Sequence, residues 1–106
     1  MIYRVMYGLK TEERARTAFI VDTRERIDER AHNIAEAYYD NMLERGVIFG
    51  DTIEDHVKKV HEELAERNWT GWSEKAIWFK AMVRYGRQRE KAIWWEWEPI
   101  EGVVEV

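Results

Sequence analysis

The chain has 106 residues, 45% of them hydrophobic and 36% charged, with a formal net charge of −4 and no cysteine. This apolar fraction is ordinary for a globular protein and argues against disorder, and the length fits one domain spanning 1–106. Without cysteine, a disulfide framework, a thiol nucleophile and thiolate zinc sites are excluded, which suits a cytoplasmic protein.

No stretch approaches the roughly 20 apolar residues that cross a bilayer, and residues 1–10 lack the pattern of a signal peptide. We therefore expect no membrane partner. The charges are unevenly distributed, because residues 22–67 carry thirteen acidic and seven basic side chains, whereas 1–21 and 68–106 together carry eight acidic and ten basic ones. A general nucleic-acid binder needs a broad basic surface, so this distribution argues against one.

The first twenty-two residues predict a β-hairpin. Tyr3, Val5, Tyr7 and Leu9 alternate with other residues, which is typical of a strand with one buried face. A polar connection, "LKTEER", leads to "RTAFIVD", a second segment rich in β-forming residues.

The period changes after Asp22, and two helices are predicted. The first runs to about Glu44 on a stripe of Ile27, Ala31, Ile34, Tyr38 and Met42, with Asp22 and Glu25 as a capping pair and Gly46 at its C-terminal end. The second begins near Thr52, with Asp55 completing a capping box, and ends near Asn68. Its apolar stripe consists of Ile53, Val57, Val60 and Leu64.

A hexapeptide then occurs twice, as "EKAIWF" at 74–79 and "EKAIWW" at 90–95. We interpret both copies as strands of a second hairpin, 77–85 and 93–98, with "GRQRE" as its turn and Pro99 as its end. The tail "GVVEV" would add a short edge strand. An alternative stays open, because Ser73 can cap a helix over 74–85 in which Trp72, Ala76, Phe79 and Val83 have helical spacing.

The predicted fold is therefore α+β in the order ββααββ, a four-stranded antiparallel sheet with two helices packed on one face. Its outer sheet face would be unusually apolar, which is typical of a contact surface. The outward apolar residues would be Ile2, Met6, Ala18, Ile20, Trp78, Met82 and Trp94, among the charged residues Arg4, Arg16, Lys80, Arg84, Glu96 and Glu98.

The charged and catalytic residue types point to binding rather than catalysis. Glu25, Glu29, Glu36 and Asp40 lie opposite the apolar stripe of the first helix and predict an acidic surface. "ERAH" at 29–32 has the Glu-x-x-His spacing of metal ligands, but the second copy that a di-iron site needs is missing, so we expect no metal. No phosphate-binding loop or catalytic set is recognisable, His56 and His61 are expected on the surface, and we expect neither an enzyme nor a cofactor.

The sequence thus predicts a small non-enzymatic interaction protein that binds a protein partner or forms a homodimer. The predicted binding residues are Trp78, Met82, Arg84 and Trp94, with Glu25, Glu29, Glu36 and Asp40 as a second surface. Such a chain suits a phage or mobile-element protein that inhibits a host factor. The alternative is a module for single-stranded nucleic acid or a small ligand, using tryptophans and the basic turn residues Arg84, Arg87, Arg89 and Lys91 of the C-terminal hairpin.

Overall fold

The computed structural model describes residues 1–101, which form three helices and a three-stranded antiparallel sheet in the order ββαααβ. The elements are β1 (Ile2–Leu9), β2 (Arg16–Val21), α1 (Arg24–Glu44), α2 (Ile53–Glu66), α3 (Glu74–Ala92) and β3 (Ile93–Pro99). The α+β class and the antiparallel sheet are confirmed, but the predicted order and the four strands are wrong for this part of the chain. The strand predicted at 102–106 lies outside the described residues.

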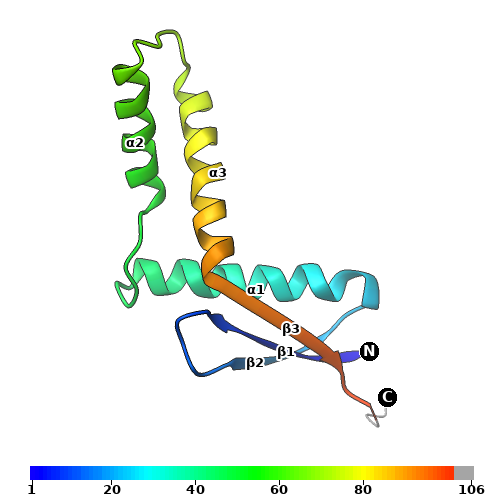
Figure 1. Cartoon of the computed structure of the whole chain (residues 1–106). Coiled ribbons are helices and arrows are strands. Elements are labelled where there is room, and N and C mark those ends of the chain that lie inside the picture. Colours follow the sequence, from blue (N-terminus) through cyan, green and yellow to red (C-terminus); the bar gives the residue numbers. More distant parts are fainter. Residues whose placement is uncertain (102–106) are drawn as a thin grey trace.

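The molecule has two parts (Figure 1). The sheet and α1 form a base, and α2 and α3, with the loop 67–73 between them, form a helical hairpin that projects from it; we call this hairpin the arm. The radius of gyration is 18.2 Å and the long axis measures 63 Å, whereas a compact chain of this length has a radius of about 13 Å. One helix, α1, covers the inner face of the sheet, in place of the two helices predicted there.

The core of the base lies between the sheet and α1. The strand order is β2-β1-β3, and β1 pairs antiparallel with both neighbours. Because side chains alternate along a strand, one face of this sheet packs on α1. The buried residues at that interface are Tyr3, Val5, Leu9, Ile20 and Ile93 from the sheet and Ile27, Ala31 and Ala35 from α1.

The outer sheet face differs from the prediction on β2. Ala18 lies opposite Val5, and Ile20 opposite Tyr3, so both belong to the inner face. Phe19 and Val21 point outward instead and are 67% and 69% exposed. The prediction was one residue out of phase on this strand, which turns every side chain to the opposite face.

The segment 74–92 is a helix, so the alternative interpretation is confirmed and the second hairpin is wrong. The Ser73 hydroxyl caps the helix by accepting from the Ala76 N–H, at 3.1 Å. Ile77, Ala81 and Tyr85 are buried at a spacing of four residues. The first hexapeptide therefore lies inside α3, whereas the second spans its end and the start of β3, where Ile93 is already extended.

The N-terminus of α2 has the predicted capping box and offers a clean test. The Asp55 N–H donates to Thr52 Oγ1 at 3.1 Å, and the Thr52 N–H donates to the Asp55 carboxylate at 2.9 Å, which lowers the pKa of that carboxyl. We expect Thr52→Ala to lower the free energy of unfolding by about 1 kcal/mol, measured by urea denaturation. Thr23→Ala is the control, since Thr23 caps α1 without a side-chain hydrogen bond. Equal losses of unfolding free energy in the two variants would contradict a stabilising cap by the Thr52 side chain.

Candidate protein-binding surface

Helix α3 buries one stripe against α2. Ile77 and Ala81 pack with Val60 and Leu64 of α2 in a cluster that shares no buried residue with the clusters of the base. The arm therefore has a small hydrophobic core of its own, which lies between two helices. No other described element lies on the side of α3 that faces away from α2 along most of its length (Figure 1).

That uncovered side of α3 is apolar. Trp78, Phe79, Met82 and Val83 are 43%, 69%, 50% and 39% exposed. Their spacing of three and four residues places them next to one another on the helix surface. Gly86 follows on the same side, and a Cβ there would meet no atom within 4 Å. We call these five residues the outer α3 face. An apolar patch of this kind is typical of a site that contacts another molecule.

A basic row runs along one edge of the outer α3 face. Lys80, Arg84, Arg87 and Lys91 recur at helical spacing. The first three line a shallow hollow of about 480 Å³ with Trp72, Ala76, Phe79 and Val83. Arg84 also donates to Glu63 of α2, at 2.8 Å for one of the two bonds, and this guanidinium lowers the pKa of the Glu63 carboxyl.

The tip of the arm is aromatic. Trp69 and Trp72 stack with ring centroids 6.5 Å apart and planes 6° apart, and they are 48% and 40% exposed. The loop turns through left-handed backbone at Asn68 and Gly71. Arg67 lies over the Trp69 ring and Lys80 over the Trp72 ring. The tip therefore presents indole and cationic groups together.

The predicted site residues do not form one surface. Trp78 and Met82 lie together on α3, with Arg84 on the basic edge, but Trp94 lies on the outer face of the sheet. A Cβ at Gly8 would come within 3.2 Å of Trp94 Nε1, so the indole covers this glycine of β1. The predicted common sheet face of Trp78, Met82 and Trp94 is wrong because Trp78 and Met82 are helical.

The predicted acidic surface of α1 is divided in two. Arg89 of α3 forms ion pairs with Glu36 and with Asp40, the latter at 2.9 Å. Tyr85 donates to Asp40 at 2.6 Å, and burial raises the pKa of the Tyr85 hydroxyl. Glu36 and Asp40 thus hold the arm to the base, so these two members of the predicted acidic surface already have a basic partner within the chain. Glu25 and Glu29 are exposed, as predicted.

The four basic residues predicted at a hairpin turn are all on α3. Arg84, Arg87 and Lys91 share its basic row, whereas Arg89 points to α1 and is held by its two carboxylate partners. A turn beside aromatic strands, which motivated the nucleic-acid alternative, does not exist in this segment. The arrangement leaves a basic helix edge in which Arg84 is neutralised by Glu63.

A partly buried polar cluster joins the arm to the base. The Gln88 amide donates to the Tyr39 hydroxyl at 2.8 Å and to the Asp51 carbonyl at 2.9 Å. Its oxygen accepts from His56 Nε2 at 2.7 Å, since an amide oxygen can only accept. His56 is only 8% exposed, so its predicted surface position is wrong. On the other side of α3, Glu90 contacts His32 of α1, at 2.9 Å.

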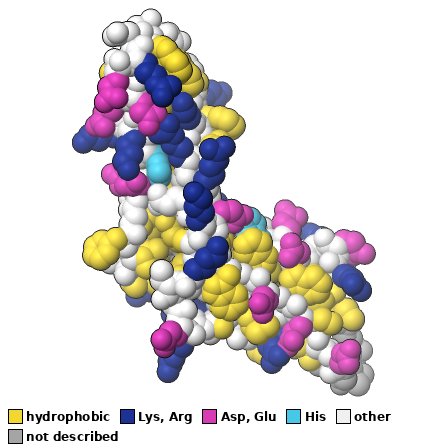
Figure 2. Space-filling view, viewed as in Figure 1, with side chains coloured by type: hydrophobic (Ala, Val, Ile, Leu, Met, Phe, Trp, Pro, Cys, Tyr) yellow, Lys and Arg dark blue, Asp and Glu magenta, His cyan; other side chains and the backbone are white. Residues whose placement is uncertain are grey.

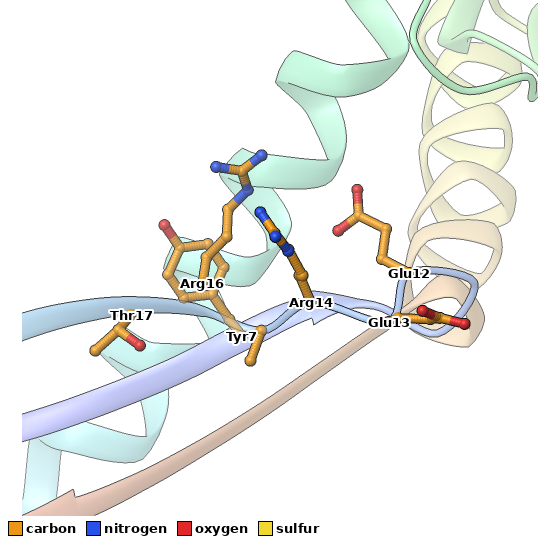
Figure 3. Close-up of a pocket in the computed structure, with 7 residues that line it drawn as sticks. Tyr7, Glu12, Glu13, Arg14, Arg16 and Thr17 are labelled. Carbon is orange, nitrogen blue, oxygen red and sulfur yellow. The ribbon is translucent and has the colours of Figure 1, made fainter.

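A hollow of about 780 Å³ lies at the β1–β2 turn (Figure 3). Its lining includes Tyr7, Glu12, Arg14 and Arg16. Nearby, the Tyr38 hydroxyl donates to Glu12 at 2.8 Å, and the Arg16 guanidinium lies 4.8 Å from the centre of the Tyr38 ring. These contacts hold the β1–β2 turn against α1. The side chains around the hollow are therefore explained by a structural role and give no reason to assign a ligand site.

Sequence interpretation missed Phe79, Val83 and Gly86 as members of the surface. Their signal was the helical spacing of Trp72, Ala76, Phe79 and Val83. Residues 1–101 contain no group of three or more His, Cys, Asp or Glu side chains that could hold a metal ion, and no helix with the length and apolarity to span a membrane. The chain matches no known protein family, no curated protein and no solved structure.

Proposed function

We propose that this protein is a non-enzymatic protein-binding module that uses the outer α3 face. The observation that supports it most is the row of large apolar side chains along α3, which are 39–69% exposed. Helix α2 packs on the opposite side of α3 and leaves this row uncovered. Burying such side chains gives about 1.5–3 kcal/mol each before the costs of association. A helix with apolar residues at spacings of three and four is suited to lie against another helix.

The basic edge defines the chemistry of the partner. Lys80, Arg87 and Lys91 border the outer α3 face, and Lys75 lies near its far end. Opposite charges across an interface steer association and exclude wrong partners. The expected partner surface is therefore an apolar helical surface flanked by Asp and Glu.

A photo-crosslinking amino acid placed at Met82 tests this function in cells that express the chain. We expect covalent protein adducts from position 82, because Met82 lies in the middle of the outer α3 face and is 50% exposed. Val21 is the matched control position, since it is 69% exposed on the outer sheet face. Adducts formed only with nucleic acid, or protein adducts only from position 21, would contradict the proposal.

A further inference from the structure

We infer that the partner of the outer α3 face is a helix of another protein, which inserts a bulky apolar side chain into the hollow between Trp72 and Val83 and binds Arg87 through a carboxylate. This inference rests on the proposed function and names the groups by which the partner is recognised. It follows from the lining of the hollow, the contacts of the cations at its rim, and the exposure of Arg87.

The hollow lies along α3 at Ala76. Its volume is about 480 Å³, and Trp72, Phe79 and Val83 are the large apolar residues of its lining. Ala76 also lines it and is exposed, but it contributes only a methyl group among these larger side chains. The chain therefore leaves this space unfilled. An apolar hollow with a few polar groups at its rim is suited to receive an anchor side chain of a protein partner.

The Trp72 side of the hollow is held in place by contacts within the chain. The Trp72 indole stacks on Trp69 with ring planes 6° apart, and the Lys80 ammonium lies 5.3 Å from the centre of the Trp72 ring. The next residue, Ser73, caps α3 through its hydroxyl. A site whose side chains are already ordered loses less conformational entropy when a partner binds.

The cations that line the hollow differ in what they contact. Lys80 lies over Trp72, and Arg84 donates two hydrogen bonds to the Glu63 carboxylate. Arg87 is exposed and forms no hydrogen bond or ion pair with the residues that the structure describes. Its guanidinium suits a carboxylate of the partner, because it can donate to both carboxylate oxygens at once. Figure 2 shows Lys and Arg side chains along the α3 side of the arm, with hydrophobic side chains beside them.

The spacing of the hollow and Arg87 defines the partner's sequence. Arg87 lies one helical turn beyond Val83, toward the end of α3 that meets the base. On a partner helix that lies along α3, residues three or four positions apart share one face and span the same distance. The partner helix should therefore carry a bulky apolar residue and, three or four positions away, an Asp or Glu.

A single-stranded nucleic acid fits the same groups less well. Its bases need open aromatic faces and its phosphates need several available cations. The Trp72 ring already has Trp69 and Lys80 against it, and Arg84 is bonded to Glu63. An apolar protein side chain, which needs only the hollow and one guanidinium, is the better match.

The photo-crosslink from position 82 tests the inference with the natural partner. We expect Arg87→Glu to lower the yield of the protein adduct about tenfold or more, because the reversed charge repels the partner's carboxylate. Lys91→Glu is the matched control, since it makes the same change of charge one turn further along α3 and outside the hollow. Its effect should be clearly smaller.

Filling the hollow tests the anchor separately from the charge. We expect Ala76→Leu to lower the adduct yield as well, because the leucine side chain occupies the space that the anchor needs. Ala37→Leu is its control, since Ala37 is an exposed alanine on α1. Leucine is a good helix former, so both variants should fold, and circular dichroism checks that they do.

Selection from a library of displayed helical peptides on the purified chain tests the chemistry of the partner. We expect the enriched peptides to combine a bulky apolar residue with an Asp or Glu three or four positions away. The same selection on the Arg87→Glu chain should replace this acidic residue by Lys or Arg. Enriched peptides without the acidic residue, or the same acidic preference on both chains, would overturn the inference.

Two further results would overturn it. One is an undiminished protein adduct from position 82 in both Ala76→Leu and Arg87→Glu, in which case the outer α3 face binds a protein without the hollow and the proposed function stands. The other is tight binding of a labelled single-stranded oligothymidylate that both variants abolish, which would assign the hollow to nucleic acid. If position 82 gives no protein adduct at all, both proposals fail.

Discussion

Ile77→Ala is expected to destabilise the arm by about 2–5 kcal/mol, the usual cost of removing a buried isoleucine side chain. Ile77 is 5% exposed and belongs to the small cluster formed with Val60, Leu64 and Ala81. With only two helices around this cluster, little structure is available to relax into the cavity. The loss should show as faster amide hydrogen exchange in α2 and the first half of α3, with exchange in β1 and α1 unchanged.

Ile27→Ala is the matched control for this experiment. Ile27 has the same side chain, is fully buried, and belongs to the cluster between α1 and the sheet. Its replacement should accelerate exchange in α1 and β1 first. If both variants accelerate exchange uniformly along the chain, then arm and base unfold as one unit and the separation of their cores has no energetic meaning.

Local signals were sufficient to predict β1, α1 and α2, but not the phase of β2, the burial of His56 or the start of α1, where Thr23 rather than the predicted Asp22–Glu25 pair is the N-cap. The alternation of β1, the apolar stripes of α1 and α2, and the Thr52–Asp55 capping box all appear in the structure where the sequence predicts them. Gly46 has a φ of +71°, the left-handed conformation expected after α1. Each of these features depends on residues within one turn or one strand, which is why a single sequence is enough to predict them.

Helix α3 could not be settled in the same way, because its apolar residues satisfy two periods at once. Ile77, Phe79, Ala81, Val83 and Tyr85 alternate as a strand would, yet Ile77, Ala81 and Tyr85 also share a helical face. The structure resolves this ambiguity by burial, since those three are buried and Phe79 and Val83 are exposed. The burial depends on α2, whose position relative to residues 77–85 the local sequence does not specify.

The surface residues show the same contrast between local signals and tertiary contacts. Trp78 and Met82 were predicted as exposed from a strand pattern, and they are exposed on a helix instead. Glu36 and Asp40 were predicted on an acidic surface, and nothing in the sequence indicated their partner, Arg89, which is about fifty residues away. Pairings over that distance follow from the tertiary fold, so residue type and spacing alone could not reveal them.

Gly50→Ala is expected to lower the free energy of unfolding by about 1–3 kcal/mol, the cost of leaving partly buried polar groups unpaired. A Cβ at position 50 would lie 3.1 Å from Gln88 Nε2, 3.2 Å from the Tyr39 hydroxyl and 3.4 Å from Leu43 Cδ1. The added methyl group therefore displaces the amide that joins α3 to the segment before α2. Urea denaturation at one fixed protein concentration measures the change.

Two controls test whether the loss of stability in Gly50→Ala comes from displacement of the Gln88 amide. Gly86→Ala adds the same methyl group where nothing lies within 4 Å, so it should stabilise by about 0.5–1 kcal/mol through the helix backbone. The two glycine variants thus have opposite expected signs. In a Gln88→Ala background, the added cost of Gly50→Ala should shrink, because the displaced hydrogen bonds are already absent. If Gly50→Ala lowers the free energy of unfolding by the same amount in the Gln88→Ala background, then Gly50 acts through its own backbone conformation. In that case Arg89 and its carboxylate partners, rather than the Gln88 amide, hold the arm to the base.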